Sequence, residues 1–309
     1  MFRALELRTG RLRWETKLSP DTVQYFFHGD PLFSGEVIVI GADRATGASI
    51  HALDRATGRE LWKHAAGRGV NGPIAGDGRR AYAARFEGQL LSLDIGSGTL
   101  QWAIDLKVPG LEGPAAARDS VFVGTVDGSL HALKGETGRE EWRLNFGAPV
   151  STTVIASNGD LYAGTADGAI HRIDGARGAL LASRKLDPIL KPTSVPVRTA
   201  DSVLVLLVDQ SGDYRAVASL DPGLDNVRWR VAADKNWTTS RIFVWGDVIV
   251  LGTPLGNVEA YCAKTGVPAW SRSIKGRVRS VGGVEDILLV GTPGGDLYAM
   301  RAPRSCDAK

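Results

Sequence analysis

The sequence predicts an all-β protein, a seven-bladed β-propeller of four-stranded antiparallel blades. Two observations predict it. Short apolar runs joined by turn signals fill the chain, and a Gly-x-x-x-Trp spacing returns about every 40 residues. A period of this length with strand-type units is typical of propeller blades, in which neighbouring units cover each other's apolar faces.

The clearest unit runs from Ser120 to Trp142 and reads SVFVGTVDGSLHALKGETGREEW. Its runs VFVGT and LHAL are rich in apolar and β-branched residues, and Asp127-Gly128 between them is a strong hairpin signal. Thr137-Gly138 predicts the next turn, because Gly adopts a positive φ without steric cost. Such a short hairpin cannot bury both faces alone, so it needs the neighbours that the repeat supplies.

The Trp of each unit is predicted to lock one blade onto the next rather than to bind a ligand, because so large a side chain buries a large area. Two units break the pattern: Gly178 is followed by Ala182 in place of Trp, and Trp229 is preceded by Asp225 in place of Gly. The regular pairs are Gly10/Trp14, Gly58/Trp62, Gly98/Trp102, Gly138/Trp142 and Gly266/Trp270.

The chain begins and ends within a unit. Residues 1–18 match the third and fourth strands of a repeat, and residues 278–301 supply three strands without a following Gly-x-x-x-Trp. We therefore expect one domain, 1–309, whose last blade is closed by the N-terminal strand 11–18, which leaves no free sheet edge. FRALEL and LYAMRA both resemble a third strand, so an eight-bladed ring is the alternative. The intervening units are 22–66, 71–106, 112–146, 151–186, the divergent 187–233, and 235–274.

Composition and charge exclude some classes of protein. No apolar stretch approaches the roughly 18 residues of a membrane span. The net charge of +3 and the lack of a Lys/Arg-rich run give no reason to expect a nucleic-acid partner. Cys262 is expected to be a small buried hydrophobic residue and Cys306 a free thiol. The opening residues lack a basic-then-apolar leader, so a cytoplasmic location is expected, or an extracytoplasmic one if a leader has been removed.

The units VFVGTVDGSLHALKGETGREEW and LYAGTADGAIHRIDGARG resemble the PQQ-like β-propeller repeat. That repeat occurs in quinoprotein dehydrogenases, in the outer-membrane assembly lipoprotein BamB and in sensor domains of bacterial serine/threonine kinases. The resemblance covers nearly the whole chain and implies the fold rather than the chemistry. The dehydrogenases of this family carry adjacent disulfide-bonded cysteines and acidic calcium ligands beside the quinone. This chain has neither pattern, so we expect no cofactor and no metal.

Other motifs point to structure. Gly67–Gly72, GRGVNG, is a formal G-x-G-x-x-G, but no helix signal follows it, so we expect an interblade turn rather than a nucleotide site. His51, His131 and His171 share one position of the repeat and are expected to be packed or hydrogen-bonded on separate blades, not gathered around a metal. Asp54, Asp94 and Asp174 are expected to accept hydrogen bonds from the turns that follow them.

The remaining candidates lie in the connections that lead from one blade to the next. In a propeller these connections reach the central funnel, where ligands bind because side chains converge. Five basic residues there, against the single acid Glu112, suggest an anionic ligand or an acidic partner surface. The alternative is a solvated rim. The predicted ligand-binding residues are Tyr25, His28, Arg68, Asn71, Glu112, Lys191, Trp237, Arg277 and Arg279.

Two functions are compatible with these patterns. The first is a non-catalytic propeller, a scaffold or sensor that binds a protein partner or a small anionic ligand through its funnel or ring face. The second is a cofactor-independent enzyme of specialised metabolism with its pocket in the funnel. Its catalytic candidates are His28 and Glu112 as acid or base, with Lys191 holding an anion. The regular repeat without a catalytic motif favours the first.

Overall fold

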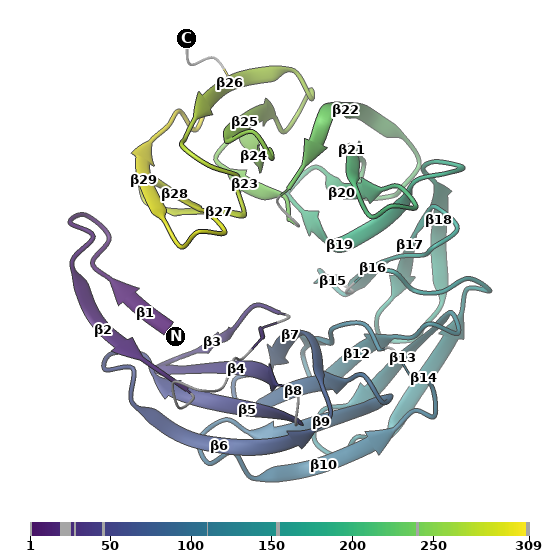
Figure 1. Cartoon of the computed structure of the whole chain (residues 1–309). Coiled ribbons are helices and arrows are strands. Elements are labelled where there is room, and N and C mark those ends of the chain that lie inside the picture. Colours follow the sequence, from purple (N-terminus) through teal and green to yellow (C-terminus); the bar gives the residue numbers. More distant parts are fainter. Residues whose placement is uncertain are drawn as a thin grey trace. The chain divides into compact units, whose positions relative to one another are not determined.

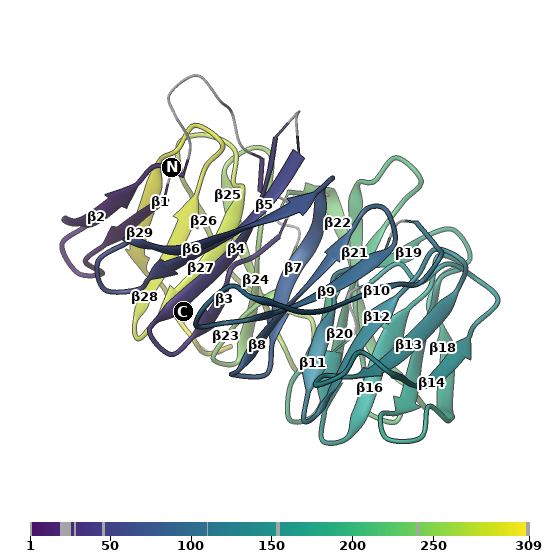
Figure 2. The same ribbon diagram turned by 90° about the horizontal axis from the view of Figure 1, so that it is seen from below.

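The computed structural model describes residues 2–18, 26–27, 29–44, 47–109, 111–152, 155–238 and 241–306. All of its regular elements are strands, as expected, and within each sheet every strand pairs antiparallel with the next one along the chain. The strands of each sheet lie side by side in chain order (Figure 1; Figure 2). No membrane-spanning helix is found in the part of the chain that the structure describes.

The chain divides into two compact units, one of residues 1–159 and 175–179, the other of residues 160–174 and 180–309. The first unit begins with a two-stranded sheet and continues with three four-stranded sheets. Its strands are β1 (Phe2–Leu5) with β2 (Leu12–Thr16); β3 (Leu32–Ser34), β4 (Val37–Arg44), β5 (Gly47–Asp54) and β6 (Glu60–Gly67); β7 (Val70–Gly76), β8 (Arg80–Arg85), β9 (Gln89–Asp94) and β10 (Leu100–Asp105); β11 (Ala115–Ala117), β12 (Ser120–Gly124), β13 (Ser129–Lys134) and β14 (Glu140–Asn145); and β15 (Ile155–Ser157).

The second unit holds the remaining strands and ends with a three-stranded sheet. The number of blades and the closure of the last blade by residues 11–18 stay predictions. The strands are β16 (Asp160–Gly164), β17 (Ala169–Asp174) and β18 (Leu180–Lys185); β19 (Lys191–Arg198), β20 (Val203–Val208), β21 (Tyr214–Leu220) and β22 (Val227–Trp237); β23 (Phe243–Trp245), β24 (Val248–Gly252), β25 (Asn257–Cys262) and β26 (Pro268–Ser273); and β27 (Ser280–Val284), β28 (Ile287–Gly291) and β29 (Leu297–Arg301).

The hydrophobic core lies between neighbouring sheets. In several sheets the second and third strands are nearly continuous buried runs, because both of their faces are covered, whereas the fourth strand alternates and faces solvent. Val39, Ile50 and Ala52 of one sheet, for example, pack with Val70 and Ile74 at the start of the next. Each sheet therefore depends on its neighbour for burial of apolar area.

The repeated Trp joins one sheet to the next wherever it is present, as predicted. Trp62 Nε1 donates a hydrogen bond to the carbonyl oxygen of Ile95, 2.7 Å away in the turn between β9 and β10. The same bond is made from Trp14 to Arg55, Trp102 to Gly135, Trp142 to Gly175, Trp229 to Ala263 and Trp270 to Pro303.

The Gly of the following turn is the second half of this joint. Gly98 adopts φ +71°, and a Cβ built on it would lie 2.5 Å from ring carbons of Trp62. A Cβ built on Gly58, Gly138, Gly178 or Gly266 would lie 2.4 to 2.9 Å from the Trp ring of the preceding sheet. Gly is therefore required for two reasons: it adopts the positive φ, and it leaves the space that the indole ring occupies.

The two irregular units are neighbours, and the Trp–Gly contact that would join them is absent. Ala182 lies on β18, where the Trp should be, and Asp225 lies in the turn that should carry the receiving Gly. In place of the indole, Tyr162 Oη donates to the carbonyl oxygen of Pro222 at 2.8 Å, and Arg184 Nη2 donates to that of Asp225 at 2.7 Å. Without a Trp to accommodate, the turn does not need Gly.

The cysteines correct one expectation. Cys306 is not a free thiol, because it forms a disulfide with Cys262 at the end of β25. The two residues are 44 positions apart, and nothing in the local sequence around either one indicates the pairing. Cys262 is buried, as expected, but it is the inner half of a covalent link.

Candidate functional site

The segments that join one sheet to the next, here called connectors, share one buried position. Each carries an aliphatic side chain that is at most 8% exposed. The residue after it begins the inner strand or pairs its backbone with the second strand, as Glu112 N–H does with Gly124 O and Arg279 N–H with Gly291 O. The buried positions are Val70, Leu111, Val150, Leu190, Ile242 and Val278.

Four predicted site residues occupy equivalent places, directly after this buried residue: Asn71, Glu112, Lys191 and Arg279. Arg277 comes directly before Val278, and both arginines are exposed. Arg68 lies in its connector with its side chain 87% exposed and 3.7 Å from Glu87. Tyr25 and His28 lie outside the described residues, as does the side chain of Asn71.

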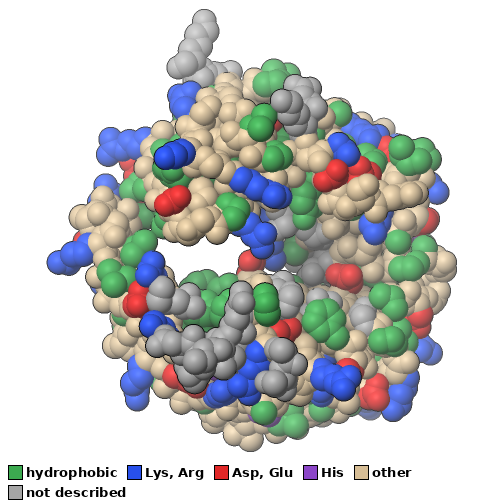
Figure 3. Space-filling view, viewed as in Figure 1, with side chains coloured by type: hydrophobic (Ala, Val, Ile, Leu, Met, Phe, Trp, Pro, Cys, Tyr) green, Lys and Arg blue, Asp and Glu red, His purple; other side chains and the backbone are tan. Residues whose placement is uncertain are grey.

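The funnel itself stays a prediction. Arg68, Asn71 and Glu112 belong to the first compact unit, and Lys191, Arg277 and Arg279 to the second. Within the second unit, burial raises the pKa of Tyr214, and the nearby charge of Arg279 opposes that rise. On the face shown in Figure 3, Lys and Arg side chains lie among Asp and Glu side chains. The anionic ligand and the roles of His28, Glu112 and Lys191 in catalysis are therefore untested.

Trp237 was wrongly predicted to line a pocket. It ends β22 and is only 2% exposed, packed with Leu204, Leu206 and Val217 in the core between two sheets. Its Nε1 donates to Glu259 Oε2 at 3.0 Å. The sequence misled because Trp237 breaks the spacing of the repeat, and a residue outside the repeat can serve packing as well as binding.

The repeated histidines are packed or hydrogen-bonded within their own sheets, and Asp54 and Asp94 accept bonds from the turns that follow them, as predicted. His171 bonds Ser183 and Thr165 through its two ring nitrogens at 2.7 and 2.9 Å, and His131 Nδ1 lies 2.7 Å from Glu140 Oε2. Asp54 accepts bonds from the N–H and hydroxyl of Thr57, which lower its pKa. The described residues contain no group of His, Cys, Asp or Glu able to hold a metal ion. GRGVNG joins β6 to β7 without a helix.

The connector of residues 186–190, between β18 and β19, presents the most exposed large apolar side chain among those described. Ile189 is 73% exposed. Its neighbour Leu190 is the buried residue of this connector, and Lys191 follows at the start of β19. Covering a large aliphatic group that is exposed to water is favourable, so Ile189 is a candidate contact residue.

The connector is rigidly held. Asp187 Oδ1 accepts hydrogen bonds from the backbone N–H groups of Ile189 and Leu190, both at 2.8 Å, and its other oxygen pairs with Arg230 at 2.6 Å. Burial opposes ionisation of Asp187, but these bonds outweigh it and keep its pKa below the usual value. Leu186 N–H donates to Gly168 O at 2.8 Å. Ile189 is therefore displayed by a preorganised loop.

A hollow of about 290 Å³ opens beside Ile189. It carries the cation of Lys191 and the carboxylates of Asp167 and Asp209, both with lowered pKa. Burial opposes ionisation of Asp167 and its bond from Thr165 favours it, while Arg215 favours that of Asp209. An apolar side chain beside polar and charged groups could serve as the centre and rim of a protein contact. The lining residues are Ala166, Asp167, Pro188, Ile189, Leu190, Lys191, Asp209 and Gln210.

Sequence reasoning selected Lys191 in this site and missed Ile189 and Asp187. A signal was present: the connector DPIL has two aliphatic residues in a row, although only one can fill the buried position of a connector.

Comparison with known proteins shows the family. The family model described as "Outer membrane protein assembly factor BamB" matches residues 46–186 and, in a second overlapping match, 87–221. A curated BamB of Yersinia pestis is 27% identical over 137 residues, which is 41% of this chain and 35% of that protein. The chain thus matches about a third of that relative's length.

Solved structures extend the likeness to nearly the whole chain. BamB from Moraxella catarrhalis superposes with a TM-score of 0.75 at 20% identity, over 96% of this chain and 88% of that one. The computationally designed Ika8 protein superposes with a TM-score of 0.57 at 15% identity, over 90% and 97% of the two chains. At these identities the likeness shows the fold, an all-β propeller, which confirms the fold class expected from the repeat.

Proposed function

Because the chain belongs to the PQQ-like propeller family described as outer membrane protein assembly factor BamB, we propose that it is a non-catalytic scaffold that binds a protein partner. The single observation that carries the proposal is the exposed Ile189 on its braced connector. Exposed apolar anchors with a polar rim contribute most to the affinity of protein interfaces. The name of the relatives suggests a partner within outer membrane protein assembly.

We further propose an extracytoplasmic location, the alternative to the cytoplasmic one expected from the opening residues. The support is the bond between Cys262 and Cys306. Disulfides persist in oxidising compartments such as the periplasm and are rare in the cytosol.

Site-specific photo-crosslinking tests the docking surface. A photoreactive residue at position 189 should capture a partner in the native cell, whereas one at position 267 should not. Val267 is the matched control, because it is 60% exposed and lies in the turn between β25 and β26. The captured protein is then purified and its affinity measured.

Charge introduction completes the test. Ile189→Asp should weaken binding of the purified partner by at least about tenfold, since it puts a charge where an apolar anchor is buried. Val267→Asp should leave the affinity unchanged. Equal affinity of parent and Ile189→Asp, or equal crosslinking from positions 189 and 267, would refute this surface.

A further inference from the structure

The last residues described take the place of a missing turn. In the complete sheets, each Trp donates to a carbonyl in the turn before the fourth strand of the next sheet; Trp270 donates instead to Pro303 O, at 3.0 Å. Pro303 belongs to segment 302–306, which follows β29. Asp247 N–H donates to Arg304 O at 2.7 Å, and the Arg304 guanidinium lies 4.6 Å from the ring centre of Trp245. The segment therefore docks sheet β27–β29 against sheet β23–β26.

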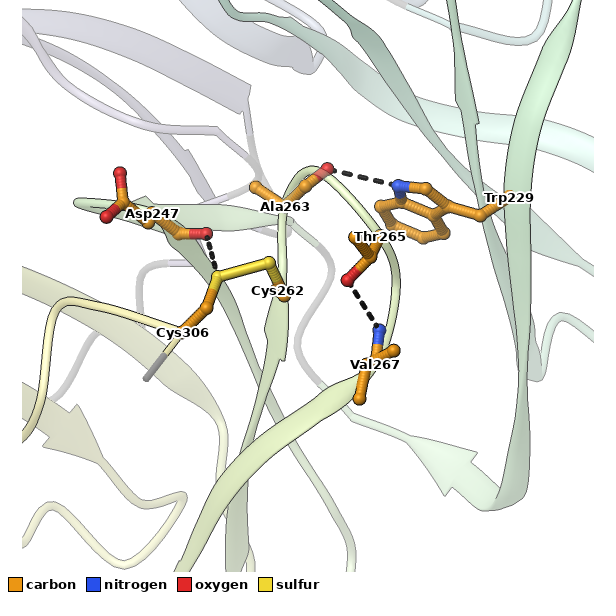
Figure 4. Close-up of a disulfide and its surroundings, with 7 residues drawn as sticks. All are labelled: Trp229, Asp247, Cys262, Ala263, Thr265, Val267 and Cys306. Carbon is orange, nitrogen blue, oxygen red and sulfur yellow. Dashed lines mark hydrogen bonds between the residues drawn. A yellow bond between two sulfur atoms is a disulfide. The ribbon is translucent and has the colours of Figure 1, made fainter. Parts of the chain in front are cut away.

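The disulfide fixes this segment covalently. Cys306 ends the segment and Cys262 ends β25 (Figure 4). Ala263, the residue after Cys262, is the acceptor for Trp229 of the preceding sheet. One sulfur–sulfur bond thus ties the C-terminal segment to the turn that also receives the previous sheet. Among the described contacts that hold the C-terminal segment, this disulfide is the bond that a thiol can break reversibly.

The disulfide is open to a reagent. A groove of about 420 Å³ is lined by both cysteines. Cys262 is only 8% exposed, and Cys306 is the more exposed of the pair. An incoming thiolate therefore reaches Cys306 Sγ, and Cys262 Sγ is the leaving group. The groove also holds the charged side chains of Asp201, Arg228, Asp247 and Lys264, two of each sign.

We propose that this groove is a thiol-exchange site whose reaction releases the C-terminal segment. A small thiol, as its thiolate, attacks Cys306 Sγ; the new sulfur–sulfur bond forms as the bond to Cys262 breaks, and Cys262 departs as a thiolate that takes up a proton. A second thiol then displaces the first from Cys306, so that two thiols are oxidised to one disulfide and the protein disulfide is reduced to two thiols.

Release weakens the joint between the last two sheets. Trp270 loses its carbonyl acceptor when segment 302–306 departs, and Trp245 loses the Arg304 cation that lies over its ring. Gly283 of β27 packs directly against Trp245, so this sheet is the next element to loosen. The exchange site is thus a switch for exposure of two indole rings.

Reduced glutathione on the full-length oxidised protein is the test. Under native conditions, intact-mass analysis should find one glutathione per chain, and peptide mapping should place it on Cys306 with a free thiol on Cys262. Hydrogen exchange of residues 278–306 should then rise by about tenfold, as for other local openings, while exchange of β12 and β13 stays the same. Free thiols in the protein prepared under oxidising conditions would overturn the proposal, as would unchanged exchange after reduction.

Two variants separate the bond from the segment. The double change C262S/C306S should show the raised exchange of residues 278–306 without glutathione and no further response to it. Arg304→Ala removes the cation over Trp245 but keeps the disulfide, and it should still respond to glutathione. If the double variant exchanges as slowly as the oxidised parent, the disulfide does not hold the segment and the proposal fails.

Discussion

At the scale of single residues, the turn Gly does more than adopt a positive φ. Gly98 (φ +71°) has the Trp62 ring against it, whereas Gly10 (φ +69°) has nothing within 4 Å of an added Cβ. The two positions therefore carry the same backbone strain on substitution and differ in the indole contact.

We expect Gly98→Ala to destabilise the protein by about 2 kcal/mol more than Gly10→Ala, because only the first pushes a methyl group into a packed ring. Urea unfolding of both variants, with equal slopes, measures the difference. Equal losses would mean that the φ requirement alone selects Gly, and that the indole contact contributes nothing.

A second residue, His51, makes stability depend on pH. Burial lowers its pKa to about 4, and the nearby Lys63 and Arg44 cations add to the effect. The Glu60 carboxylate, 3.6 Å from Nδ1, is 38% exposed and too well solvated to reverse it. As the pH falls from the ordinary histidine pKa of 6.5 to about 4, the unfolded chain binds a proton before the folded chain does, so the free energy of unfolding decreases.

The expected loss from His51 is at most about 3 kcal/mol, and it is absent above the unfolded pKa. His51→Gln should therefore reduce the fall in unfolding free energy between pH 7 and pH 5, relative to the parent. His64→Gln is the control that changes a histidine of the adjacent strand. A pH dependence that is the same in His51→Gln and the parent would refute a buried, neutral His51.

At the scale of elements, the joint between sheets β15–β18 and β19–β22 works without Trp and Gly. Tyr162 replaces the indole as the buried donor to the neighbouring turn. Tyr162→Phe leaves the Pro222 carbonyl without this bond and should cost about 1 kcal/mol or more.

Tyr298→Phe is the matched control for Tyr162→Phe. The Tyr298 hydroxyl donates to Lys275 O at 3.1 Å, but that bond is exposed, so water replaces it and the expected loss is close to zero. Thermal unfolding of the two variants measures both. A loss at Tyr298→Phe as large as at Tyr162→Phe would contradict the role given to the buried bond.

At the scale of the whole molecule, closure of the last blade by residues 11–18 is testable through β29. If strand 11–18 is the fourth strand beside β29, deletion of residues 1–18 should increase amide exchange of residues 297–301, because an edge strand loses its hydrogen-bond partner. Trp14→Ala is the control, since it removes the joint to Arg55 and Gly58 but keeps the strand. Unchanged exchange at 297–301 after the deletion would reject closure.

The sequence was sufficient for the fold and insufficient for the site, for a physical reason. A repeat of about 40 residues exposes the same constraints many times, so the strands, the turns and the Trp joints were predictable from spacing. Trp237 and Ile189 each occur once. Whether such a residue is buried or exposed depends on packing between sheets, which spacing does not encode. The disulfide was missed because its partners meet only through the path of the C-terminal segment.

The joint between sheets has a consequence for how such a chain can grow. Each regular unit of about 40 residues carries a Gly that packs against the Trp of the preceding unit and a Trp that packs against the Gly of the following one. Duplication of one such unit therefore yields a copy whose Gly and Trp already fit both neighbours, so no new contact between units has to evolve. The joint at Ala182 and Asp225 lacks both the Trp of the first unit and the Gly of the second. A regular unit inserted between these two units would find no Trp for its Gly and no Gly for its Trp, so it should not fit.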